Sequence, residues 1–320
     1  MTNKAQKPSL RPHHKHFVAD TDEQGLGAVD AVKDAEAPQS QWGEAWKSLR
    51  KRPLFWISGL LILVACLMAA FPSLFTNVDP RYCELSKSLA GPESGHPFGF
   101  NRQGCDIYAR VIYGARASVL VGIFATLFVT VLGTAIGAIA GYVGGWIDSV
   151  ISRIIDVFFA VPLLLAAIVF MQMFRDSRSI WSVVFVLGIF GWVSIARITR
   201  GTVMSTKQEE YVTASKSLGA SSSKILFKHI LPNSTAPIIV YATVSLGVFI
   251  VAEASLSFLG IGLPSNVVSW GGDISAAQDS LRTRPSILFY PAGGLVLTVL
   301  GFILMGDVVR DALDPKARKR

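Results

Sequence analysis

The chain has 320 residues, of which 51% are hydrophobic and only 16% are charged, and its mean hydropathy is +0.46. Soluble domains usually carry about a quarter charged residues, so the composition excludes an ordinary soluble enzyme and a disordered chain and indicates a membrane protein. The net charge of +8 is compatible with nucleic acid or with an anionic membrane surface, and the placement of the cations decides between them.

Residues 1–40 are polar and charged and show no apolar period, so we expect a disordered tail. His13, His14 and His16 cluster in this tail. Because no carboxylate or cysteine accompanies them, the sequence predicts no metal site.

Residues 41–53 have the pattern of a short amphipathic helix. Trp42, Trp46 and Leu49 fall on one helical face, opposite charged residues. This pattern predicts a helix that lies on the membrane lipid, with its indoles at headgroup level. The alternative is a simple start to the first membrane span.

Six apolar stretches approach the roughly 20 residues that a helix needs to cross a bilayer. The predicted architecture is therefore an all-α polytopic membrane protein with six transmembrane helices. These spans are Leu54–Leu74, Ser118–Tyr142, Ile151–Phe174, Ile180–Ile198, Pro237–Leu259 and Leu288–Gly306.

The cations fix the predicted orientation. With the N-terminus in the cytoplasm, most of the 30 Lys and Arg residues lie on the cytoplasmic side. An even number of spans returns the C-terminus to that side. The basic balance therefore reflects membrane topology, and we expect no nucleic-acid partner.

The segment 75–115 lies on the extracytoplasmic side of the membrane in this topology and contains Cys83 and Cys105. The third cysteine, Cys66, lies within the first span. Exposed cysteines in an oxidising compartment tend to pair, so a disulfide between Cys83 and Cys105 is a hypothesis, and two free thiols are the alternative.

Gly133, Gly137 and Gly141 leave one face of the second span without side chains. Such a stripe allows close approach of another helix. We expect packing within the same subunit, with lining of a pore as the alternative.

Charged residues within the spans are few. Glu253 is a carboxylate at membrane depth, where it needs a partner or water. It is equally compatible with a place on a translocation path and with a role as a helix anchor. Arg153 and Asp156 lie three residues apart and can pair with each other.

The motifs of common enzymes are absent from the sequence. It contains no GxxxxGK[ST] phosphate loop, no HExxH and no GxSxG. We therefore predict no catalytic residues, no enzymatic activity and no cofactor in this chain. Uphill transport would need energy from another subunit or from an ion gradient.

The cytoplasmic segment 199–236 is too long for a simple connector. We expect a first helix from about Lys207 to Leu218, which Gly219 ends. One side of this helix carries Tyr211, Ala214 or Ser215, and Leu218.

We expect Ser221 or Ser222 to cap a second helix, with an apolar face of Ile225, Leu226 and Ile230, and Pro232 to stop it. Such a helix–Gly–helix element is suited to docking into a groove on a soluble partner. An amphipathic pair that lies on lipid is the alternative.

This segment resembles the EAA loop of ABC-importer permeases. The motif spacing, EAA-x3-G and then x9 to an apolar-x-Leu-Pro, matches Thr213, Ala214, Ser215, Gly219, Leu231 and Pro232. Thr213 stands where the motif has Glu, and Ser215 where it has Ala. Glu209 and Glu210, one turn upstream, are the nearest carboxylates. By this resemblance the ATPase-coupling residues are Glu209, Glu210, Thr213, Ala214, Ser215, Gly219, Ala220, Ser221, Leu231 and Pro232.

Further motifs are similar to the dipeptide/oligopeptide/nickel permeases of the DppC/OppC type, over roughly residues 45–316. Cys105 stands where such chains often have a basic residue, which strengthens the disulfide hypothesis. The matching stretches are 96–99, 106–118, 141–145, 156–158, 253–260, 269–271 and 306–315.

The resemblance implies a type I ABC-importer permease fold, in which this chain forms half of a translocation pathway for peptides. It also implies a homologous second permease subunit, an extracytoplasmic substrate-binding protein, and two ATPase subunits that bind the ATP and Mg. Import of nickel or another small solute is an alternative, as is an ATP-independent carrier or scaffold.

The resulting domain organisation has five parts. They are the tail 1–40, the interfacial helix 41–53, the first span with the outer segment 54–116, the five-helix core 117–306 with the coupling loop 199–236, and the basic cytoplasmic C-terminus 307–320.

Overall fold

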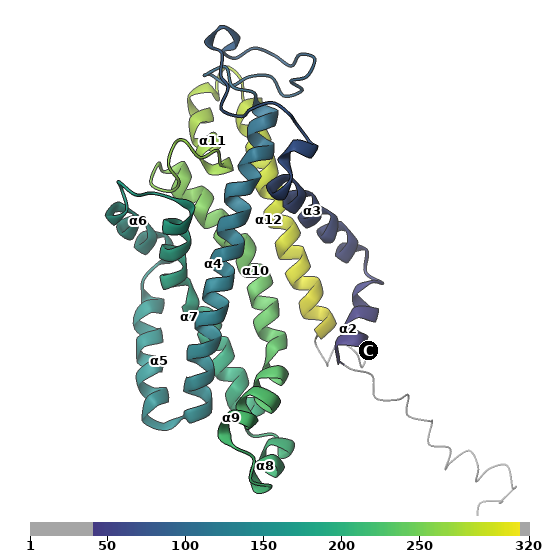
Figure 1. The fold of residues 1–320 in the computed structure, drawn as a ribbon, viewed down its shortest axis with the longest axis vertical. Helices are drawn as coiled ribbons and strands as arrows, with labels where there is room; N and C mark the ends of the chain where they lie inside the picture. The colour runs from purple at the N-terminus through teal and green to yellow at the C-terminus, as the bar shows by residue number, and fades with distance from the viewer. Residues whose placement is uncertain (1–40, 314–320) are drawn as a thin grey trace, which may run out of the picture.

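The computed structural model describes residues 41–313, so the tail with its histidines and residues 314–320 lie outside the described range. The described part is built from helices (Figure 1). Five are long and apolar enough to cross a membrane, and a bent pair makes a sixth crossing if it counts as one span. The prediction of an all-α polytopic protein is thereby confirmed. The elements are α2 (Gln41–Leu49), α3 (Pro53–Ala70), η1 (Pro72–Leu74), η2 (Leu85–Lys87), α4 (Ile107–Val143), α5 (Gly145–Ala160), α6 (Leu163–Met173), α7 (Ile180–Thr206), α8 (Glu210–Ser217), α9 (Ser222–Lys224), η3 (Ile225–Ile230), α10 (Leu231–Phe258), α11 (Trp270–Ala277), η4 (Gln278–Ser280) and α12 (Ser286–Leu313).

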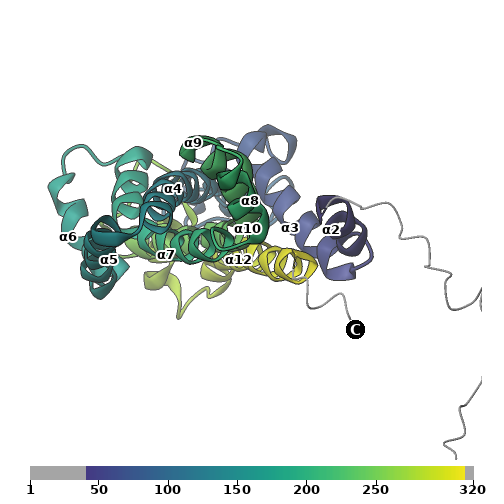
Figure 2. The same cartoon turned by 90° about the horizontal axis from the view of Figure 1, so that it is seen from below.

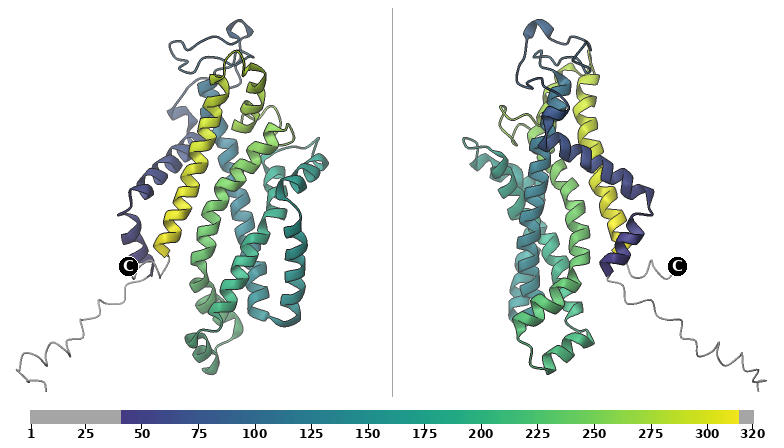
Figure 3. Two further views of the ribbon diagram at one scale, coloured as in Figure 1. Left: turned by 180° about the vertical axis from the view of Figure 1, so that it is seen from behind. Right: turned by 45° about the vertical axis from the view of Figure 1, so that its right-hand side comes forward.

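The long helices run between two ends of the molecule. The loops of residues 75–106 and helix α11 lie at one end, which we call the disulfide end, and α8 and α9 lie at the other, the α8 end (Figures 1 and 3). Seen along the long axis, α5 lies towards one side and α12 towards the other, with α7 and α10 between them (Figure 2). One end of the bundle therefore carries the disulfide between Cys83 and Cys105, and the other end carries the short helices α8 and α9.

Helix α2 and the start of α3 lie beside the last turns of α12. Proline at the first position of α3 suits a helix start, because its missing N–H would be unpaired there. Arg52, just before that proline, pairs with Asp311 of α12 at 2.6 Å. Charges at the ends of two apolar helices mark a polar boundary at this depth.

Helix α4 begins well before the predicted span, at Ile107 rather than near Ser118. The side chain of Asp106 caps it by accepting a hydrogen bond from the Ala109 amide at 2.6 Å. The first turns contain arginines that hydropathy assigns to a loop, but tertiary partners satisfy them. Arg116, for example, donates to the carbonyl of Ala69 at 2.8 Å.

The prediction of a continuous third span over Ile151–Phe174 is wrong. Helices α5 and α6 are bent by 84° at a short break. Val161 is extended and Pro162 precedes α6, because a residue before proline is pushed out of the helical region. The predicted pairing of Asp156 with Arg153 is also wrong, since Asp156 pairs with Arg197 of α7 at 3.3 Å.

The helix that contains Pro232 does not stop there, contrary to prediction. Residues 222–258 form one helical run that passes through a π-helical turn, η3. In this turn the amide of Leu231 donates to the carbonyl of Leu226, five residues back. The wider π-helical turn allows the helix to continue through Pro232, which has no backbone N–H to donate. The coupling loop is thus shorter than predicted, because α7 extends to Thr206 and this run begins at Ser222.

Candidate functional site

The residues that match the EAA motif lie together at the α8 end. Helix α8 ends in a turn in which the Ala220 amide donates to the Ser215 carbonyl at 3.1 Å. Gly219 lies in this turn with φ +80°, a conformation that glycine adopts without steric cost. The chain therefore reverses at Gly219, as the motif spacing predicts. We call residues 209–232 the coupling element.

The coupling element is attached to the bundle by a small apolar cluster. Val212 of α8 and Ile225 and Ile230 of η3 are buried against Ala138 of α4 and Val203 of α7. The predicted apolar face of the second helix is therefore the packed face. This cluster connects α8 directly to the ends of two long helices.

The other face of the coupling element is exposed and partly apolar. Tyr211, Ala214 and Leu218 of α8 are exposed, with Leu218 88% exposed, and Phe227 of η3 is exposed as well. Glu209, Glu210, Thr213, Ser221 and Pro232 are exposed as well. An exposed apolar surface rimmed by polar residues is typical of a protein interaction site.

The predicted serine cap is only partly right. Ser221 occupies the cap position of α9 in an extended conformation, but its side chain makes no capping hydrogen bond. Leu231 packs against the apolar cluster. The structure thus brings Val212, Ile225 and Leu231 together and leaves Thr213 and Ser215 on the surface side of α8.

The glycine stripe of α4 packs against the backbone of α7 in the same chain. A Cβ atom at Gly133 would lie 2.7 Å from the carbonyl oxygen of Trp192, and one at Gly141 would lie 2.8 Å from that of Arg200. A Cβ atom at Gly137 would collide with the Ala196 carbonyl. Close packing of α4 on α7, rather than a pore, accounts for these three glycines.

Glu253 is fully buried where α10 crosses α4. The hydroxyls of Ser118 on α4 and Ser257 on α10 each donate to its carboxylate at 2.7 Å. The Ser257 hydroxyl also accepts from the Leu263 amide at 3.2 Å. These contacts link two helices and the following loop, which is the geometry of a helix anchor.

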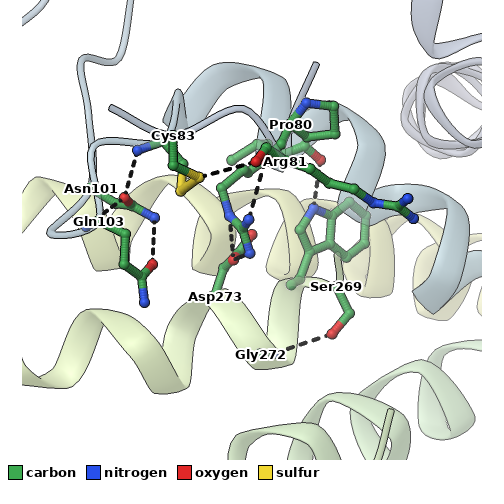
Figure 4. A network of polar contacts seen from close by, with 12 residues as sticks. Pro80, Arg81, Cys83, Asn101, Gln103, Ser269, Gly272 and Asp273 are labelled. Atoms are coloured by element: carbon green, nitrogen blue, oxygen red, sulfur yellow. Dashed lines mark hydrogen bonds and ion pairs between the residues drawn. A yellow bond between two sulfur atoms is a disulfide. The ribbon is translucent and has the colours of Figure 1, made fainter. Parts of the chain in front are cut away.

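A polar network holds the disulfide end together (Figure 4). Cys83 and Cys105 are joined by a disulfide across 22 residues. Arg110 of α4 donates to the Asp273 carboxylate at 2.8 Å and to the Pro80 carbonyl at 3.2 Å. Burial raises the pKa of Asp273, and the guanidinium of Arg110 opposes that shift.

The tryptophan of α11 strengthens the same network. The fully buried Trp270 donates from its indole N–H to the Val111 carbonyl at 2.8 Å. The sequence predicts no pairing of Arg110 with Asp273, because 163 residues separate them. Arg110 lies within the matching family stretch 106–118, and Asp273 follows the stretch 269–271 by two residues, which is the one signal that the sequence offers.

Among residues 41–313, no group of three or more His, Cys, Asp or Glu side chains could hold a metal ion.

Comparison with known proteins relates the chain to transport permeases. Residues 133–319 match the family described as "Binding-protein-dependent transport system inner membrane component", and residues 40–92 match "N-terminal TM domain of oligopeptide transport permease C". The oligopeptide transport system permease protein OppC of Bacillus subtilis is 38% identical over 292 residues, which cover 91% of this chain and 95% of that protein.

Two further relatives are equally similar. The dipeptide transport system permease protein DppC of Alkalihalophilus pseudofirmus is 38% identical, with coverage of 89% of this chain and 93% of the relative. The glutathione transport system permease protein GsiD of Salmonella paratyphi A is 38% identical, with coverage of 92% and 96%.

Proposed function

This chain belongs to the family of binding-protein-dependent transport-system inner-membrane components, and from that premise we propose that it is a permease subunit of an ATP-driven peptide importer. The relatives reported above are named as transporters of oligopeptides, dipeptides and glutathione. All three cargoes are peptides. The chain would form half of the pathway across the cell membrane.

The observation that carries this proposal is the exposed face of the coupling element. Tyr211, Ala214, Leu218 and Phe227 present apolar surface at one end of a membrane bundle, where no other part of the described chain covers them. We assign this end to the cytoplasm, in agreement with the distribution of Lys and Arg. An ATPase subunit would dock on this surface.

Force applied at the coupling element has a direct route into the bundle. Val212 ties α8 to α4 and α7, and α9 continues without a stop into α10. A displacement of α8 would therefore move the ends of three long helices together. Rigid-body motion of this kind converts ATP-driven closure into a switch between inward- and outward-facing states.

Glu209 and Glu210 would supply the carboxylates with which the coupling element contacts an ATPase subunit. Thr213 offers no carboxylate, and its hydroxyl lies 3.5 Å from the Glu209 carbonyl of its own helix. Both glutamates are exposed at the start of α8. They are the acidic side chains within this element that an ATPase subunit could contact.

The complete transporter would contain a homologous second permease, two ATPase subunits and an extracytoplasmic substrate-binding protein. ATP and Mg would be bound by the ATPase subunits, and this chain would bind no cofactor and catalyse no reaction. The disulfide end would face the binding protein. Membrane lipid would surround the remaining helix faces.

Reconstitution tests the proposal. Proteoliposomes that contain this chain, the second permease, both ATPases and the binding protein should accumulate a labelled dipeptide or oligopeptide only when ATP is present on the ATPase side. Omission of the ATPases should abolish import. Peptide accumulation by this chain alone, driven by an ion gradient, would overturn the proposal in favour of a carrier.

A further inference from the structure

A groove runs along one side of the bundle between α7 and α10. Its upper part is lined by aromatic and small side chains around the α5–α6 bend, including Phe159, Ser194 and Tyr241, and has a volume of about 250 Å³. Its lower part, of about 650 Å³, is lined by α10 and the end of α12. Tyr241 and Val244 line both parts, so the two parts adjoin each other along α10, and we treat them together as the groove.

The groove is long enough to extend from the membrane interior to its edge. From Phe249 in the upper part to Ala236 in the lower part, the helical rise gives a length of about 20 Å. The lower part also contains Asp307 and Arg310 of α12. Both are close in sequence to Asp311, whose pairing with Arg52 marks the polar boundary.

Two further residues of opposite charge, Asp156 and Arg197, lie close to the groove where its two parts adjoin. Arg197 precedes Ile198, a residue of the lower lining, and its guanidinium lies 4.3 Å from the centre of the Phe159 ring, which belongs to the upper lining. Asp156 of α5 pairs with Arg197 at 3.3 Å. Asp307 and Arg310 thus belong to the lower lining itself, at the end that we call the inner mouth, whereas Asp156 and Arg197 lie next to the groove, behind Phe159 and Ile198.

The ion pair between Asp156 and Arg197 is weak enough for each side chain to release the other and bind a different charged group. Its side chains are 58% and 47% exposed, and exposed pairs contribute only about 0–1 kcal/mol. One turn further along α7, Arg200 donates two hydrogen bonds to the Asp148 carboxylate, of 2.5 and 2.6 Å. The Arg200 side chain is 30% exposed and the Asp148 side chain 16% exposed. The tighter pair holds α5 against α7, so the looser pair is not needed for that purpose.

We propose that this groove forms this chain's half of the cargo pathway, and that Asp156 and Arg197 bind the charged groups of a peptide as it passes towards the inner mouth. A peptide carries an ammonium and a carboxylate group, and each needs an opposite charge when it leaves water. The groove and the two residues beside it offer both signs in equal number. A lipid-headgroup site on an anionic membrane would instead be lined by cations alone.

The inference rests on the proposed function and names where its cargo travels. The first test uses the full transporter with Cys66→Ala as background, in inside-out vesicles treated with a membrane-impermeant maleimide. Val248→Cys lies in the groove, and Val296→Cys on α12 is a matched control, because both valines are exposed on long helices and Val296 lies outside the groove lining. We expect at least tenfold faster labelling at Val248→Cys. Equal labelling would overturn the pathway assignment.

The second test compares import of two peptides that differ only by Glu or Lys at one position. Arg197→Gln should slow the acidic peptide relative to the basic one about fivefold, the loss expected for one exposed charge contact of about 1 kcal/mol. Asp156→Asn should shift the ratio in the opposite direction. Arg153→Gln, at a neighbouring exposed arginine, should leave the ratio unchanged, and Arg197→Lys should restore it.

The outcomes separate this inference from the proposed function. If the wild-type transporter imports no peptide, the proposed function fails. If the wild type imports both peptides and the Arg197→Gln ratio equals the wild-type ratio, the charge-binding role fails. Loss of the second permease from purified Arg197→Gln complexes would assign the pair to a subunit interface and would also overturn the role in cargo binding.

Discussion

The hydroxyl of Ser118 on α4 donates a 2.7 Å hydrogen bond to the carboxylate of Glu253 on α10, in a site from which solvent is excluded. A second serine, Ser257, completes the coordination of that carboxylate. The sequence alone is compatible with two roles for Glu253, on a translocation path or as a helix anchor. The two donors and complete burial favour the anchor.

Glu253→Ala should therefore destabilise the protein. It leaves two buried hydroxyls without their acceptor and opens a small cavity, at a cost of about 3 kcal/mol. The melting temperature of the detergent-solubilised transporter would measure this loss. Ser255→Ala is the control, because Ser255 bonds only to its own helix, at the Val251 carbonyl, and should change the melting temperature little. A role on the pathway would instead appear as slower import by Glu253→Gln with an unchanged melting temperature.

Gly137→Ala should separate α4 from α7. The added methyl group would collide with the Ala196 carbonyl, and overpacking of this kind costs about 1–3 kcal/mol. Gly201→Ala is a matched control, because a Cβ atom at Gly201 on α7 meets no atom within 4 Å; alanine there should stabilise the helix by up to about 1 kcal/mol. Thermal unfolding of both variants checks the prediction, and equal destabilisation would contradict it.

Gly219→Val should uncouple ATP hydrolysis from import. The positive φ of Gly219 is unfavourable for a β-branched residue by roughly 1–2 kcal/mol, so the turn after α8 would change its direction. Gly219→Asn should retain coupling, because asparagine tolerates this conformation. The measurement is peptide imported per ATP hydrolysed in proteoliposomes, with membrane insertion checked in parallel. An unchanged ratio for the valine variant would argue against a hinge at this position.

Removal of the disulfide should loosen the outer loops. Cys83→Ser with Cys105→Ser releases a cross-link over 22 residues, which stabilises by about 3 kcal/mol in the chain-entropy description. Limited proteolysis of right-side-out vesicles should cut the 84–104 segment faster than in the wild type. Non-reducing mass spectrometry of the wild type provides the direct check, since two alkylatable thiols in this segment would show that no bond forms.

The coupling element shows which structural features can be predicted from local sequence patterns and which cannot. The spacing of Ala214, Gly219 and Pro232 was sufficient to predict a helix, a glycine turn and a second helix, because capping and turn preferences depend on neighbouring residues. Whether Pro232 ends the second helix was not predictable in this way. The π-helical turn before it is compatible with packing of Ile225 and Ile230 on α4 and α7, and those contacts come from distant parts of the chain.

The amino-acid sequence by itself determined the membrane architecture, the approximate spans and the position of the coupling element. Hydropathy, helix periodicity and motif spacing are properties of contiguous residues, so they can be read without knowledge of the fold. Only the tertiary structure decided the bend between α5 and α6 and the partners of Asp156, Glu253 and Asp273. An ion pair or a buried hydrogen bond depends on which helices lie side by side, and that is a property of the packed bundle.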